Sequence, residues 1–583
     1  MSQSGEQSVL ERNLAALRRV GSGAERVLRQ AAPLARQAAQ FPRELPADIY
    51  CFILQGMQPP EMLHELLNRE GRDRIFFVFE REAGAALDAL SRCDLSEGIA
   101  AGRLLLFVGP QAGKDLEQTL FNNDSVPMPE WILPADPEGA EYYRQQSNVT
   151  FTRMLQRRQY VIQYMADELK EYYTETSAAR AREITTGEAK MKVMLYDPRS
   201  GVEGRFASEL AEAFAELGQD VALCRFRSPE QPSIFPVLKR ITACKPDVFL
   251  AFSASRPSIG VWIAPEVPLA FYLLRPEENL LNASVEAPLR LTGSDAVIAS
   301  CARYHEGLVA SGLDPARLAM IAPGVSVSSG EPEPIPEQER SGLVFIGDAT
   351  DVNPIRLGLK EDSALLWQRV GRLVQEQGPF YSFGQAGALV HKACAGALIE
   401  FDLEQHENYF SLLAECRLAR QAQREGLLEA LSARFPLKIL GSGWGSCASL
   451  GPRADPAPQD AASLSREISR AAAAVYIDSC GVPGREFLEA ARAQVAILAN
   501  RSALDGQSGP EAFAAGKEVL VFDTRKEMFG MAKRLLTNRG LRQRLAAAAF
   551  KKASTHYHIR STAERVLGFL RSVFAGMIKA QDP

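Results

Sequence analysis

Charged side chains stand directly before an apolar run in the stretch GREFLEAARAQVAILA, residues 484–499. Arg485, Glu486 and Glu489 fall in a short alanine-rich segment that predicts a helix, and the run AILA that follows predicts a buried strand. Glu489 lies one position before the apolar face of that helix, where a carboxylate has to be solvated by a cleft or bound to a partner. These residue types allow a carboxylate that accepts hydrogen bonds beside a guanidinium that binds an anion.

The same spacing also fits a purely structural role. Arg485 and Glu489 are four residues apart on the expected helix, so they can form a surface ion pair worth roughly a few tenths of a kcal/mol. Gly481 and Gly484 precede the helix and can bring backbone N–H groups close to a bound anion. The residues alone leave both interpretations open.

The composition is that of an ordinary globular protein: 583 residues, 46% hydrophobic and 23% charged, which predicts roughly three or four domains. The net charge of −5 argues against nucleic acid as a partner but allows small anionic ligands. The nine cysteines form no CxxC pair, so we expect reduced thiols without a zinc or disulfide framework. Without a signal-peptide pattern or a membrane-spanning apolar run, we expect a cytoplasmic protein with no transmembrane segment.

The elements that must position these side chains alternate between strands and helices over most of the chain. Two doubly wound domains joined by one linker would form a cleft lined by the carboxyl ends of both sets of strands. The alanine-rich N-terminus could also pair helices in a homo-oligomer. The expected segments are a helical N-terminus (1–45), an N-terminal α/β module (46–150), a helical connector (151–188), a first Rossmann domain (189–325), a Pro-, Glu- and Ser-rich linker (326–342), a second Rossmann domain (343–560) and a C-terminal helix (561–583).

The N-terminal module has a weak nucleotide-binding signal. QGMQPP, residues 55–60, follows its first expected strand, and Glu80 ends the second. Such a glycine and acidic residue are typical of Rossmann folds, but QGMQPP lacks the G-x-G-x-x-G fingerprint and has two prolines in the loop. A methyltransferase or oxidoreductase site in this module is therefore the less favoured alternative.

The order of motifs in the C-terminal half resembles that of nucleotide-sugar glycosyltransferases with two Rossmann domains, the GT-B fold. Within this class the chain is most similar to the group-one subset that includes the spore-maturation CgeB-type proteins. The resemblance extends over about 190–575 and is strongest over 473–570. Residues 48–183 are faintly similar to the motility-accessory-factor proteins that glycosylate flagellin. The matching residues are Arg485, Phe487, Glu489 and Ala490; Gly516, Lys517, Glu518 and Val519; and His556, Tyr557 and Arg560.

The resemblance implies an α/β fold with two facing Rossmann-like domains (GT-B), an additional N-terminal α/β module and a helical N-terminus. It implies transfer of a sugar from a nucleoside-diphosphate-sugar, most readily a UDP-sugar, to a protein or glycan acceptor, such as flagellin or another surface glycoconjugate. Retention of configuration and catalysis without a metal or other cofactor are also implied. Arg485 and Arg356 are the expected catalytic residues, which would stabilise the leaving diphosphate. The expected donor-binding residues are Glu489, as ligand of the ribose hydroxyls, with Gly484, Gly481, Gly443, Trp444, Asp348, Lys517 and Gly204.

Departures from the family pattern keep a second hypothesis open, a catalytically silent GT-B-fold binding or scaffold protein. Relatives often have a glutamate eight positions before the ribose-binding one and a glycine five positions after it, where this chain has Gly481 and Gln494. Trp444 can equally be a core side chain, and Lys517 can belong to a solvated turn before a strand.

Overall fold

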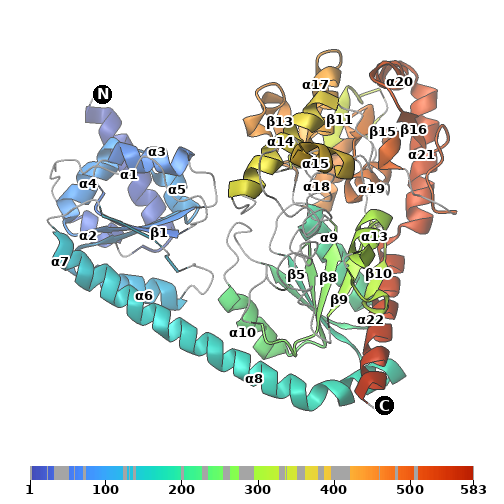
Figure 1. Cartoon of the computed structure of the whole chain (residues 1–583). Helices are drawn as coiled ribbons and strands as arrows, with labels where there is room; N and C mark the ends of the chain where they lie inside the picture. Colours follow the sequence, from blue (N-terminus) through green and yellow to red (C-terminus); the bar gives the residue numbers. More distant parts are fainter. Residues whose placement is uncertain are drawn as a thin grey trace. The chain divides into compact units, whose positions relative to one another are not determined.

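The chain forms three parallel β-sheets with helices packed against them (Figure 1). It divides into two compact units, Met1–Ala166 with Phe226–Arg240, and Asp167–Arg225 with Ile241–Pro583. Among the described helices, none combines the length and apolar character that a membrane crossing requires. The computed structural model describes residues 3–22, 24–31, 51–57, 60–69, 74–122, 128–129, 131–134, 139–197, 202–225, 234–253, 256, 263–274, 295–310, 312–326, 335–336, 338–350, 361–377, 386–395, 420–458, 460–478, 484–504 and 510–581.

The first unit holds a four-stranded sheet in the order β3-β2-β1-β4. Strands β1 and β2 are buried along their whole length, as expected for the inner strands of a parallel sheet covered on both faces. The N-terminal helices α1 and α2 pack on one face with α3, α4 and α5, whereas α6, α7 and the start of α8 cover the other. The elements are β1 (Cys51–Gln55), β2 (Ile75–Glu80), β3 (Leu104–Val108), β4 (Trp131–Pro134), α1 (Gln3–Arg19), α2 (Ala24–Leu28), α3 (Pro60–Arg69), α4 (Ala83–Arg92), α5 (Ser96–Ala100), α6 (Ala112–Asn122), α7 (Ala140–Tyr143) and α8 (Thr150–Thr186).

The second unit begins with a six-stranded parallel sheet in the order β10-β9-β8-β7-β5-β6. The strand order reverses between β5 and β7, which lie side by side although β6 lies between them in sequence. Helix α9 (Val202–Glu216) follows β5 and packs on this sheet, and it ends at Gly218, whose φ of +79° suits glycine. The strands are β5 (Lys192–Asp197), β6 (Asp220–Arg225), β7 (Val248–Phe252), β8 (Leu269–Leu273), β9 (Ala296–Ala299) and β10 (Leu318–Met320).

The second six-stranded sheet has the order β13-β12-β11-β14-β15-β16. This is the 3-2-1-4-5-6 order of dinucleotide-binding folds, in which ligands bind where the order reverses, here between β11 and β14. The predicted α/β fold with two Rossmann-like domains is thus confirmed. The strands are β11 (Leu343–Ile346), β12 (Leu437–Leu440), β13 (Ala454–Asp455), β14 (Ala473–Tyr476), β15 (Ala496–Asn500) and β16 (Val519–Phe522).

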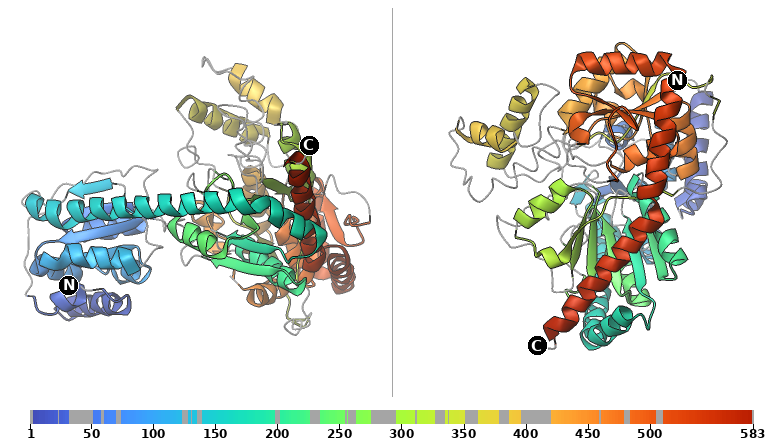
Figure 2. Two further views of the ribbon diagram at one scale, coloured as in Figure 1. Left: turned by 90° about the horizontal axis from the view of Figure 1, so that it is seen from below. Right: turned by 90° about the vertical axis from the view of Figure 1, so that its right-hand side faces the viewer.

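The last helix of the chain returns to the first Rossmann-like domain. Helix α21 (Arg539–His556) packs in the second domain, and α22 (Ile559–Gln581, red in Figure 2) then contacts α9. Ala563, Val566 and Leu567 of α22 belong to the hydrophobic core of the first domain. The C-terminal helix is therefore a structural part of the first Rossmann-like domain, although the whole second domain lies between them in sequence.

Candidate functional site

Helix α19 (Arg485–Arg492) presents the charged residues that the sequence singled out. It follows β14 at the carboxyl edge of the second six-stranded sheet, beside the point where the strand order reverses. Gly484 caps the helix, and its N–H donates a hydrogen bond of 2.9 Å to the hydroxyl of Tyr476. A Cβ at Gly484 would lie 2.6 Å from that oxygen, so the close approach of the helix to β14 requires glycine here.

Arg485 is buried and has partners in both Rossmann-like domains. Its Nε donates to Glu489 Oε1 at 2.9 Å, and its Nη2 donates to Glu209 Oε1 at 2.7 Å. Nη1 donates to the carbonyl oxygen of Gly324, in the segment that leaves the first domain. Burial lowers the pKa of Arg485, but the charges of Glu209 and Glu489 outweigh this effect and raise the pKa above its ordinary value.

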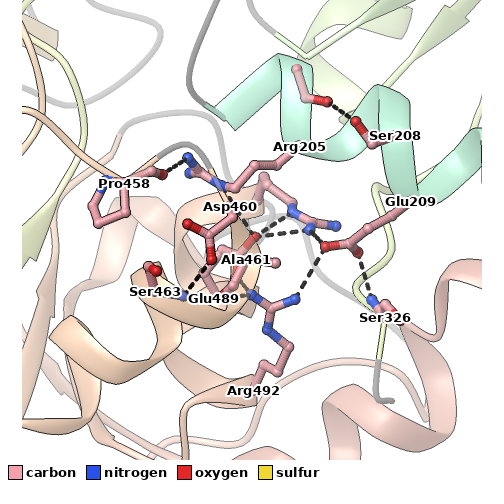
Figure 3. Close-up of polar contacts among 12 residues, drawn as sticks. Arg205, Ser208, Glu209, Ser326, Pro458, Asp460, Ala461, Ser463, Glu489 and Arg492 are labelled. Carbon is pink, nitrogen blue, oxygen red and sulfur yellow. Dashed lines mark hydrogen bonds and ion pairs between the residues drawn. The ribbon is translucent and has the colours of Figure 1, made fainter. Parts of the chain in front are cut away.

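Glu489 has no exposed surface and lies among three guanidinium groups (Figure 3). Besides Arg485, it pairs with Arg492 one turn along α19 and with Arg205 of α9, whose Nε is 3.9 Å from Oε1. Burial raises the pKa of Glu489, but the charges of Arg485, Arg492 and Arg205 more than offset this and hold the pKa below its ordinary value. Glu489 is therefore held as a carboxylate.

The alternative of a surface ion pair is excluded, although Arg485 and Glu489 do pair with each other. Both side chains are buried, because α9 of the first domain covers the face of α19 on which they lie. A buried ion pair carries a large desolvation cost and depends on complete partnering, unlike an exposed pair.

Arg205 and Glu209 of α9 complete this charge cluster, which we define as Arg205, Glu209, Arg485, Glu489 and Arg492. Nη1 of Arg205 donates to the carbonyl oxygen of Pro458 at 2.7 Å, whereas its Nε and Nη2 are buried without a hydrogen-bond partner among the described residues (Figure 3). Burial lowers the pKa of Arg205, against the opposing charge of Glu489. The Nε and Nη2 donors of Arg205 are therefore unused donors that suit an anion.

The sequence analysis missed Arg205 and Glu209, although a signal was present. Both follow the helical spacing of the buried side chains Val202, Phe206 and Leu210 on α9. Charged residues inside an apolar stripe indicate buried partners, because an unpaired charge would be expensive there. Gly204 stands beside Arg205 in the first turn of α9, so the structure brings this predicted donor-binding residue near the cluster.

Asp348, Gly443 and Trp444 lie together at the carboxyl edge of β11 and β12. The carboxylate of Asp348 accepts a hydrogen bond of 2.8 Å from the N–H of Ser442. The indole of Trp444 is 1% exposed and donates to the carbonyl oxygen of Gly347 at 2.9 Å, so it serves as a core side chain here. Gly443 has a φ of +83° and forms a turn between Ser442, which donates to Asp348, and Trp444.

Arg424 is a further buried cation at this edge that the sequence analysis did not identify. It lies on α17 (Arg420–Ser432) and donates to the carbonyl oxygens of Asp348, at 3.1 Å, and Ile477, at 3.2 Å. Its Nη2 is 3.7 Å from Asp478 Oδ2. Arg424 thus ties together the carboxyl ends of β11 and β14, where a ligand is expected.

Of the remaining predicted site residues, Lys517 is described by the structure and does not join this group. Lys517 is exposed in the turn before β16, and because β16 runs parallel to β15, this turn is at the amino edge of the sheet. The structure therefore does not bring Lys517 to Asp348 or Gly484, which follow strands at the carboxyl edge. Arg356 and Gly481 lie outside the described residues. Among the described residues, no group of His, Cys, Asp and Glu side chains could hold a metal ion.

In the N-terminal module, side chains of the chain itself occupy the carboxyl edge of β1 and β2. Gln55 Nε2 donates to Asn148 Oδ1 at 2.9 Å and to Ser147 Oγ at 3.2 Å, both in the π-helical turn Arg144–Val149. The carboxylate of Glu80 accepts hydrogen bonds from the N–H groups of Met57 and Glu82. Glu80, which with Gly56 suggested a nucleotide site, therefore has internal partners, and so does Gln55 beside Gly56.

One segment of the chain matches a known protein family. Residues 417–568 match the protein family described as Glycosyl transferase-like, a segment that includes α17, α19 and β12 to β16. No curated protein matches the chain.

Several solved structures are similar to part of the chain at low identity. A glycosyltransferase from Rickettsia africae is 10% identical, with 66% of this chain and 98% of that chain covered and a TM-score of 0.35. HepE of Anabaena, solved with UDP and glucose, is 14% identical, with coverage of 64% and 98% and a TM-score of 0.34. WaaG, a glycosyltransferase involved in lipopolysaccharide biosynthesis, is 12% identical, with coverage of 65% and 99% and a TM-score of 0.35.

Proposed function

We propose that this protein is a glycosyltransferase that moves a sugar from a nucleoside-diphosphate-sugar to an acceptor. One observation carries the proposal: the segment that matches the Glycosyl transferase-like family contains α19, which places a carboxylate and two guanidinium groups at the carboxyl edge of the second sheet. A nucleotide-sugar presents a ribose diol and a diphosphate, which are partners for a carboxylate and for guanidinium groups.

In this proposal the diphosphate binds at the start of α19, where the first backbone N–H groups of the helix and Arg485 supply positive charge. Arg205, with its unused donors, would approach the same anion from α9. Glu489 would exchange part of its guanidinium contacts for the ribose hydroxyls. Fixed positive groups aimed at the leaving diphosphate stabilise the charge that develops on it in the transition state.

The resemblance of the motifs around 485–490 and 516–519 supports the finer parts of the proposal. These are membership of the CgeB-type subset, a UDP-sugar donor, retention of configuration without a metal, and a protein or glycan acceptor in the cytoplasm. They remain predictions, as does a homo-oligomer.

A catalytically silent binding protein is the second candidate. The observation in its favour is the complete burial of Glu489, whose carboxylate is already surrounded by arginines. A methyltransferase or oxidoreductase site in the N-terminal module has less support, because Gln55 and Glu80 are bonded to other groups of the module itself.

Thermal unfolding against UDP-, GDP-, CMP- and ADP-sugars tests the proposal. A ligand that binds only the native state, at about 100 times its Kd, adds about 2.7 kcal/mol to the free energy of unfolding. We expect a rise in Tm with one sugar nucleotide in the wild type and in Glu564→Gln, a surface control, and a smaller rise in Glu489→Gln. No rise with any sugar nucleotide in the wild type would favour the silent candidate. An unchanged rise in Glu489→Gln would remove Glu489 from the site.

A further inference from the structure

The chain passes between the two Rossmann-like domains twice, and the two connecting segments form backbone hydrogen bonds with each other. The outgoing segment contains Gly324 and Val325, and the returning segment contains Tyr557 and Ile559. The N–H of Val325 donates to the carbonyl oxygen of Tyr557 at 2.8 Å, and the N–H of Ile559 donates to that of Val325 at 3.0 Å. A Cβ at Gly324 would lie 2.8 Å from Ile559 Cα, so only glycine allows this close contact. We call these two segments the hinge.

A single carboxylate, that of Glu209, connects the hinge to both domains. Glu209 belongs to α9 of the first domain and is 7% exposed. Its Oε2 accepts a hydrogen bond of 2.7 Å from the N–H of Ser326, directly after the outgoing hinge segment. Its Oε1 accepts from Arg485 Nη2 at 2.7 Å and from Arg492 Nη1 at 3.1 Å, both on α19 of the second domain.

We propose that Glu209 is an interdomain positioning residue that couples the placement of the two domains to the donor site. This inference rests on the proposed function, because it assigns to Glu209 the task of holding Arg485 and Arg492 where they serve a bound nucleotide. In the folded protein the guanidinium groups of Arg485 and Arg492 are bound by both carboxylates, those of Glu209 and Glu489. Without the charge of Glu209, Arg485 and Arg492 pair with Glu489 alone, and Glu489 is less able to accept the ribose hydroxyls.

The variant Glu209→Gln isolates this role, because the amide keeps the shape and can still accept from Ser326 while the charge is lost. Glu212→Gln is the matched control, since Glu212 is on the same helix, one turn away, and exposed. Glu209→Asp keeps the charge with a shorter reach and serves as the second variant if Glu209→Gln does not fold.

Two measurements on the full chain test the proposal: amide hydrogen exchange, and titration with UDP, GDP, CMP and ADP. In Glu209→Gln we expect the amides of Val325 and Ile559 to exchange about tenfold faster, the effect of losing roughly one charged hydrogen bond. The amides of β7 and β15, inside the two sheets, should keep their protection. The Kd of the nucleotide that binds the wild type should rise about tenfold. Glu212→Gln should match the wild type, and Glu209→Asp should change in the same direction by less.

Hinge amides that exchange at the wild-type rate in Glu209→Gln would overturn the inference, as would faster exchange spread evenly over both sheets. An unchanged Kd together with faster hinge exchange would overturn the coupling to the donor site. If none of UDP, GDP, CMP and ADP binds the wild type, the donor-site part of the inference is overturned together with the proposed function. Faster exchange confined to the hinge of the free protein would still support the interdomain role of Glu209.

Discussion

At the scale of single residues, the buried carboxylate of Glu489 is the feature on which both the stability and the proposed function of the second unit depend. Its partners Arg485, Arg492 and Arg205 come from two helices, and Arg485 and Arg492 are also held by Glu209. Removing one member of such a cluster leaves buried charges unpaired, at a cost of about 3–5 kcal/mol. Glu489→Ala is therefore a poor probe of ligand binding, because it also destabilises the fold.

The stability that Glu489 contributes should be lost in acid. Because its pKa is lower in the folded than in the unfolded protein, its contribution is complete above the ordinary glutamate pKa of about 4.3 and declines as the pH falls through the folded value. We expect the free energy of unfolding of the wild type to fall more than that of Glu489→Gln between about pH 5 and about pH 3. Chemical denaturation at both pH values measures this difference, and equal losses in the two proteins would contradict the assignment.

Gly484 and Tyr476 should behave as a coupled pair. Gly484→Ala places a methyl group against the Tyr476 hydroxyl in a packed region and should cost about 1–3 kcal/mol. Tyr476→Phe removes the oxygen that the methyl would meet, so the double variant should be less destabilised than the sum of the two single variants. Urea denaturation of the four proteins gives the coupling energy, and strictly additive costs would show that the contact at Gly484 is not limiting.

At the scale of elements, the end of α19 explains one departure from the family pattern. Gln494 has a φ of +52°, the left-handed conformation in which a glycine usually follows a helix. The N–H of Val495 donates to the carbonyl oxygen of Ala490, which closes the helix in the manner of a glycine-terminated one. The chain thus forms this turn with glutamine in place of glycine, the residue that adopts a left-handed conformation most easily. Gln494 therefore carries a small conformational strain.

Replacing Gln494 with glycine should relieve this strain. We expect Gln494→Gly to raise the free energy of unfolding by about 1 kcal/mol, since a left-handed φ costs a non-glycine residue roughly that amount. Ala493→Gly is the matched control, because Ala493 has a φ of −70° and glycine there only adds flexibility to the unfolded chain. A gain in the control, or a loss in Gln494→Gly, would contradict this account.

At the scale of the whole molecule, the second unit is closed by its last helix. The side chains Val566, Leu567 and Leu570 of α22 are buried in the core of the first Rossmann-like domain, although the second domain lies between them in sequence. Each such side chain contributes about 1.5–3 kcal/mol on burial. The first domain of this unit therefore depends on the end of the chain.

A chain that stops before Ile559 should lose the first Rossmann-like domain. The loss of several buried side chains is comparable to the whole stability of a domain, about 5–15 kcal/mol. We expect rapid proteolysis within β5 to β10, whereas a control chain that stops before Lys579 should resist cleavage like the full protein. Limited proteolysis with mass spectrometry locates the cuts, and protection of β5 to β10 in the shorter chain would contradict the prediction.

Sequence patterns alone predicted many of the strands and the helix that carries the candidate site. Strands buried on both faces must be apolar throughout, so runs such as IFFVFE and VAILA identify parallel strands without tertiary information. The charges of α19 could also be placed on a helix, because Arg485 and Glu489 are four residues apart. The predictions that succeeded depend on local periodicity.

The groups that surround Glu489 become known only from the folded chain. Glu209 lies 276 residues before Arg485, and local spacing carries no information about a contact between side chains so far apart in sequence. For the same reason the burial of Trp444 could not be predicted. A charge is stable in a protein interior only where the fold brings partners to it, and those partners come from wherever the chain returns.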